Sequence, residues 1–158
     1  MPGTLPREAP IIITRRWSGI VGFVETPTID HRRLVHPAGE PLRHRDLDLP
    51  LILVRTPLSP FQLCGFVDGL RLDGNAIRAT GTVKLVTDEE WACRLLSGRR
   101  HPAAIRVDQS VYEIAEDGEL RLMEWRIKDV AIVPYSSWEE AGIFLVEEDP
   151  CSTSSPTA

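Results

Sequence analysis

Short runs of alternating apolar and polar residues dominate this sequence and predict β-strands. In the clearest run, residues 77–85, the odd-numbered positions are apolar or glycine and the even-numbered ones are Arg, Thr or Lys. An apolar run over 63–72 precedes it, separated by the turn sequence Asp73-Gly74-Asn75. The two runs therefore predict a β-hairpin. Shorter β-branched and apolar runs at 11–14, 20–24, 51–54 and 143–146 predict further strands.

A second hairpin is predicted from strands at 104–114 and 120–133, joined by the turn sequence Glu116-Asp117-Gly118. Strict alternation along the second strand puts Trp125, Ile127, Asp129 and Ala131 on one face. Asp129 is the only acid on that apolar face. Because a buried carboxylate needs a partner or a raised pKa, Asp129 is a candidate for a specific interaction.

One helix is predicted over about residues 88–97. Thr87 and Glu90 have the spacing of a capping box, with Thr87 at the N-cap. Trp91 and Leu95 begin an apolar stripe, and Gly98 follows as the stop signal. One helix among many strands predicts an α+β, strand-rich domain, either a small closed β-barrel or a curled sheet.

The chain divides into three parts by composition. Residues 1–10 hold three prolines and predict a flexible arm, residues 11–148 form the folded domain, and residues 149–158, rich in Ser, Thr and Pro, predict a disordered tail. Within the domain, residues 25–50 show no period and carry many charges. We interpret them as a long surface segment that is either a functional or a partner-facing loop.

Composition excludes several classes of protein. The chain has 158 residues, enough for one domain, and its 42% apolar content can build a core. No apolar run reaches the length of a membrane helix, and a net charge of −5 argues against nucleic-acid binding. Cys64, Cys93 and Cys151 lack metal-binding or disulfide spacing, and we assume a reducing cytoplasm. The apolar surroundings of Cys64 and Cys93 predict that their thiols are buried.

Four sequence blocks, in this order, resemble the prohead protease (capsid maturation protease) family of tailed phages. The first is Trp17-Ser18-Gly19-Ile20 with Glu25-Thr26-Pro27-Thr28, and the second is the RDLDLPL stretch at residues 45–51. The third runs from Gly65-Phe66-Val67 to GNAIRATG at residues 74–81. The last is DVAIVP at residues 129–134 with EAGI at residues 140–143. Together they cover about residues 17–146.

The resemblance implies a barrel shared with herpesvirus assemblins and a serine endopeptidase with a Ser nucleophile, a His base and a third polar residue. It also implies a capsid or scaffolding protein as partner, no cofactor or metal, and a location in the host cytoplasm or inside the assembling prohead. Homo-oligomers are compatible with it.

This sequence departs from the family at both catalytic positions. The family's His lies between blocks two and three, but residues 52–64 contain no histidine. Arg106 stands at the position of the family's Ser, in Ala104-Ile105-Arg106-Val107-Asp108. Arginine is always charged and is no nucleophile. We therefore expect lost catalysis, and a pair between Arg106 and Asp129 in the former site; the alternative is two separate solvated charges.

If the protein is active, other groups must act. Ser110 would be the nucleophile, with His101 or His44 as base and Asp129 or Asp108 orienting it. The alternative is that Ser110 is an ordinary strand serine, and that His31, His36 and His44 are solvated loop histidines that bind no metal.

Three functions therefore remain open: a catalytically degenerate prohead-protease-like protein in head assembly, an active capsid maturation protease, or a non-enzymatic β-barrel binding module.

Overall fold

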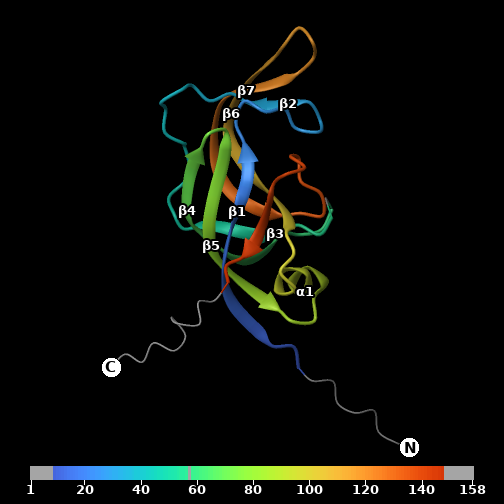
Figure 1. Cartoon of the computed structure of the whole chain (residues 1–158). Coiled ribbons are helices and arrows are strands. Elements are labelled where there is room, and N and C mark those ends of the chain that lie inside the picture. Colours follow the sequence, from blue (N-terminus) through green and yellow to red (C-terminus); the bar gives the residue numbers. More distant parts are fainter. Residues whose placement is uncertain (1–8, 57, 148–158) are drawn as a thin grey trace, which may run out of the picture.

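In the part of the chain that the structure describes, seven of the eight strands close into a barrel, and the single short helix lies at one end of it (Figure 1). The structure is a computed structural model that describes residues 9–56 and 58–147. The elements are β1 (Ile12–Phe23), β2 (Arg32–Leu34), β3 (Leu49–Leu53), β4 (Gln62–Asp73), β5 (Ala76–Val86), α1 (Glu90–Leu96), β6 (His101–Ile114), β7 (Leu120–Ile132) and β8 (Gly142–Leu145). The predicted strand-rich α+β barrel is confirmed.

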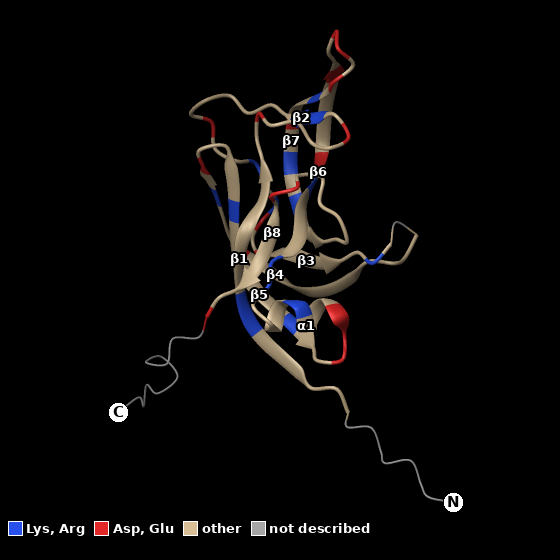
Figure 2. Cartoon of the chain, turned by 45° about the vertical axis from the view of Figure 1, so that its right-hand side comes forward, with Lys and Arg blue, Asp and Glu red and all other residues tan. Residues whose placement is uncertain are grey.

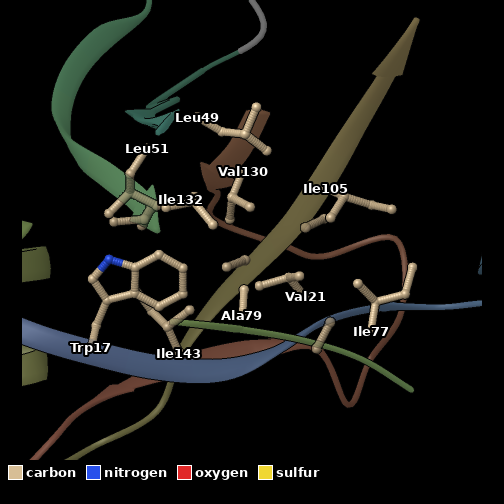
Figure 3. Packing of buried hydrophobic residues seen from close by; sticks show 14 of the residues in the cluster. Trp17, Val21, Leu49, Leu51, Ile77, Ala79, Ile105, Val130, Ile132 and Ile143 are labelled. Atoms are coloured by element: carbon tan, nitrogen blue, oxygen red, sulfur yellow. The ribbon is translucent and has the colours of Figure 1, made fainter. Parts of the chain in front are cut away.

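Around the barrel the strands follow the order β7-β3-β4-β5-β1-β8-β6, and β6 pairs with β7 to close the ring. Both predicted hairpins are present, as β4–β5 and β6–β7. The alternation along β5 is also confirmed, since Ile77, Ala79, Val83 and Leu85 are buried. These side chains meet Trp17 of β1 and Ile143 of β8 in a hydrophobic core (Figure 3).

β1 is one continuous strand, whereas the sequence predicts two short runs at 11–14 and 20–24. Trp17 and Ser18 lie between those runs and pair with Gly81 and Thr80 of β5. The indole Nε1 of Trp17 also donates a hydrogen bond to the Thr82 carbonyl, 3.1 Å away. Pairing on a neighbouring strand thus overrides a local sequence that lacks an alternating pattern.

β7 is the strand that organises the part of the chain between β1 and β4. Its edge binds β2 and β3 in parallel, and the backbones of Arg43 and Arg45 bond Ile127 between them. The segment 25–50 is therefore packed along β7, with Leu34 and Leu49 buried. Our interpretation of it as a purely surface segment is wrong at these positions, because its polar composition hides the few apolar anchors.

The helix begins at Glu90, later than predicted, and the predicted capping box is wrong. Glu89 is the N-cap residue and has no side-chain capping bond. The Thr87 hydroxyl instead accepts a bond from the Ile11 N–H, and the Thr87 N–H donates to the Ile11 carbonyl. Thr87 thereby extends the β1–β5 ladder and is not available to the helix. Gly98, at φ +85°, ends it as predicted.

A β-bulge corrects the predicted faces of β7. Arg106 pairs with Asp129 and Val107 with Ile127, so Lys128 is the extra residue. Beyond the bulge Val130 and Ile132 point into the core (Figure 3), and Asp129 and Ala131 therefore lie on the outer face. Asp129 is thus not on the face of Ile127, although only 6% of it is exposed.

The β6–β7 hairpin projects beyond the barrel at the end opposite α1 (Figure 1). Within the described ranges, no helix is both long enough and apolar enough to cross a membrane. The predicted tail at 149–158 and residues 1–8 of the predicted arm lie outside the described residues.

Candidate functional site

The outer face of the β6–β7 hairpin carries an ion pair at Arg106 and Asp129. The two residues are directly opposite each other in the antiparallel ladder. The Arg106 Nε lies 2.8 Å from Asp129 Oδ1, and its Nη2 lies 2.7 Å from Oδ2. This two-point contact is the strongest geometry for a guanidinium and a carboxylate. The expected pair therefore exists, and the alternative of two separate solvated charges is wrong.

Phe61 stacks against the same guanidinium. The Arg106 Cζ lies 4.2 Å from the centre of the Phe61 ring, which is a cation–π contact. Hydrogen bonding to Asp129 raises the pKa of Arg106 above its ordinary value, and this effect outweighs desolvation. Arg106 is thus a fixed cation, held by Asp129 and stacked on Phe61.

Phe61 comes from the segment in which the family's histidine is expected. That segment runs from the end of β3 to the start of β4, and it brings an aromatic ring onto Arg106. Arg106 is therefore in contact with a residue of the segment 52–64. Nothing in the sequence pattern of residues 52–64 predicts this contact.

Ser110 does not assemble with either proposed base. Ser110 is exposed and lies in a bulge of β6 between Asp108 and Val111. His101 is the first residue of the same strand, roughly 30 Å away at the usual rise per residue. His44 is exposed and its Nδ1 lies 2.7 Å from the Arg45 carbonyl oxygen. Among the described residues, no hydrogen bond joins Ser110 to a histidine.

Asp108 belongs to a second ion cluster farther out along the hairpin. Its carboxylate accepts bonds from Arg126 Nε at 3.0 Å and from Arg45 Nε at 2.9 Å. The bonds to Arg126 and Arg45 lower the pKa of Asp108 to about 2. Figure 2 shows how basic and acidic residues alternate along this part of β6 and β7. Asp108 is committed to these arginines and does not orient a catalytic histidine.

A third cluster at the hairpin end centres on Glu119, which is 3% exposed. Its carboxylate is within 2.8 Å of Arg33 Nε and 3.1 Å of Arg121 Nε, and Arg33 is the principal cause that lowers the pKa of Glu119. His31, Asp117 and Glu119 have ligand atoms within 4.8 Å of one another. Because two guanidiniums already neutralise Glu119, this cluster is an ion-pair network rather than a metal centre.

Comparison with known proteins identifies no relative of this chain. No family model, curated protein or solved structure matches it.

Proposed function

We propose that this protein is a prohead-protease-like protein that acts in the head assembly of a tailed phage and cleaves no peptide bond. The order of the four sequence blocks motivates the lineage, and a closed barrel with one helix agrees with the fold that the resemblance implies. Its partner in this proposal is a capsid or scaffolding protein in the host cytoplasm or inside the prohead.

The observation that carries the proposal is the state of Arg106. It stands at the motif position of the nucleophile, bound at two points by Asp129 and stacked on Phe61. A nucleophile of this kind must offer a hydroxyl that a nearby base can deprotonate. A permanently charged guanidinium cannot do so. The contact between Arg106 and the segment expected to carry the base supports the assignment of both positions.

The exposed apolar side chains beside this pair are the proposed contact region. Phe61 is 52% exposed and Leu63 is 58% exposed, although both are large apolar residues. Leu63 pairs with Ile52 of β3, and Phe66 farther along β4 is also exposed. Exposed apolar side chains that gather on one sheet face are typical of protein–protein contact surfaces.

Two measurements test the absence of catalysis. The full chain is first treated with a fluorophosphonate probe, beside a reactive serine protease as control, and then mapped by mass spectrometry. We expect no labelled serine. The chain is then co-expressed with the capsid and scaffolding proteins of the genome that encodes it, and the intact masses of those proteins are measured. We expect unchanged masses, and a label on Ser110 or a specific new cleavage product would overturn the non-catalytic role.

A third measurement tests the assembly role. We expect the wild-type chain to co-sediment with assembled particles and the Leu63→Asp variant to be lost from them. Ile114→Asp is the matched control, because Ile114 is equally apolar and 71% exposed but lies at the far end of β6. Absence of the wild-type chain from particles, or equal loss of both variants, contradicts this contact region.

A further inference from the structure

A hollow of about 440 Å³ opens at the end of the barrel where α1 lies, and neither Arg106 nor Asp129 lines it. Its walls come from parts of the chain that are distant in sequence: the end of β3, the start of α1, the start of β6 and the segment after β7. Most of the wall is apolar and is formed by Leu53, Val54, Trp91, Val133 and Pro134. The volume and the apolar lining are typical of small-molecule sites.

His101 supplies one unpaired polar atom to this hollow. The residue lines the hollow and is 9% exposed. Its Nδ1 lies 3.0 Å from the Pro102 carbonyl oxygen. Because a carbonyl only accepts, Nδ1 carries the proton and Nε2 is left as an acceptor. Among the described residues, His101 Nε2 has no hydrogen-bond partner. The one fully buried side-chain atom there that lacks a hydrogen bond is Arg33 Nε, so Nε2 is not fully buried. The Nε2 atom is therefore within reach of a molecule in the hollow.

The imidazole is neutral at pH 7. Burial is the main cause that lowers the pKa of His101, and the nearby positive charge of Arg94 lowers it further. The bond to the Pro102 carbonyl acts in the opposite direction but is outweighed by burial. His101 thus presents a lone pair rather than a positive charge.

The charged groups around the hollow balance one another. Arg55 Nη2 lies 2.6 Å from Glu89 Oε2, which also accepts a bond from the Trp91 indole. The remaining two charged residues of the lining are Arg94 and Glu90, which have opposite signs. Since the formal charges sum to zero, the lining has no net preference for an anion or a cation. The ligand that fits this lining is uncharged.

We infer that the hollow is a binding site for a small neutral molecule with an apolar ring and one hydroxyl donor. The ring packs against Trp91, Val133 and Pro134, and the hydroxyl donates to His101 Nε2. The site is independent of the proposed assembly role and uses none of the residues of the Arg106 cluster.

Three matched probes test the inference on the full chain by amide-resolved NMR titration at pH 7. The probes are p-cresol, toluene and 4-methylbenzoate, which differ in the donor and the charge but share the ring. We expect p-cresol to shift signals of the lining residues, and to bind about fivefold more tightly than toluene, as one added neutral hydrogen bond provides. We expect 4-methylbenzoate to bind more weakly than p-cresol.

Two variants assign the effect to the hollow. His101→Phe removes the acceptor and keeps a ring, so it should reduce p-cresol affinity to that of toluene. Val133→Phe fills the hollow and should weaken both, whereas Val111→Phe, on the exposed part of β6, is the matched control and should change neither. The amide spectrum of each variant verifies that it folds. Equal affinity of p-cresol and toluene for the wild type, shifts away from the lining, or no shifts at the solubility limit overturn the inference.

Discussion

Arg106 and Asp129 occupy directly paired positions of β6 and β7, and two hydrogen bonds of 2.8 and 2.7 Å join their side chains. The Asp129 side chain is 9% exposed and that of Arg106 is 30% exposed. The attraction between the two charged groups therefore compensates for part of the hydration that each of them loses on folding. This relationship makes the pair costly to break on one side.

Replacing Asp129 by Ala should lower the free energy of unfolding by about 1–3 kcal/mol, less than for a fully buried pair because water reaches Arg106. The measurement is urea-induced unfolding. Arg78→Ala is the control, since it breaks the Arg78–Asp73 pair, whose side chains are 43% and 56% exposed. That control should cost under about 1 kcal/mol. An Arg106→Met/Asp129→Leu double variant should be more stable than Asp129→Ala. Equal losses in Asp129→Ala and Arg78→Ala would contradict the role of burial.

Asp108 should make the free energy of unfolding depend on pH in the acidic range. Its pKa is depressed to about 2 in the folded protein, whereas an unfolded Asp has a pKa of about 3.9. A depressed folded pKa stabilises the protein above the unfolded pKa, and this stabilisation is lost as pH falls through the folded value. The difference in unfolding free energy between wild type and Asp108→Asn should therefore be full at pH 7 and shrink between about pH 5 and pH 2. Asp88→Asn, at an exposed position, is the control; a constant difference across this range would refute the prediction.

The two described cysteines should differ in reactivity. Cys93 is exposed, contrary to our prediction, while Cys64 is buried and its thiol donates to the Leu51 carbonyl. Burial raises the pKa of Cys64 to about 12, so almost no thiolate forms at pH 8. In a Cys151→Ser variant, a disulfide reagent should modify one thiol in the native protein and two in denaturant. Peptide mapping should find the native modification on Cys93. Rapid modification of both thiols without denaturant would show that Cys64 is accessible.

Gly81 should be far less replaceable than Gly74. A Cβ on Gly81 would lie 1.9 Å from the Phe66 carbonyl oxygen of the neighbouring strand, so the backbones would have to separate. Gly74 has φ +60° but no atom near its added Cβ. Gly81→Ala should cost more than about 3 kcal/mol and Gly74→Ala about 1 kcal/mol. Thermal unfolding and the soluble yield in lysates measure the order of the two variants, and the reverse order would refute this account.

Local patterns were sufficient to predict the hairpins but not the closure of the barrel. The β5 alternation and the turn glycines Gly74 and Gly118 act within a few residues, and both turns form as expected. The parallel neighbours of β7 are distant in sequence, so no periodicity reports them. The bulge at Lys128 also reverses the faces beyond it, and no residue type in that strand signals its position.

Only the two charged residues of the candidate site could be predicted from the sequence. Arg106 stands out because it lies where the family resemblance implies a serine, and Asp129 because strict alternation predicts it on an apolar face. Phe61 does not stand out, because an aromatic residue in a proline-containing loop is compatible with many structural roles. The hollow at His101 is formed by side chains from several distant segments, which only the assembled fold brings together.

The parallel pairing of β3 with β7 also affects which strands can pair first during synthesis. Leu51 and Val130 are about 80 residues apart, so their contact is strongly non-local. During synthesis β3, β4, β5 and β1 can pair before β7 has emerged, and the outer edge of β3 then has no partner. Such an edge is a template for pairing with other chains. Pairing of β7 with β3 covers this edge, and β8, which follows β7 in the chain and pairs with both β1 and β6, then completes the ring. The edge of β3 is therefore open to other chains only until β7 pairs with it.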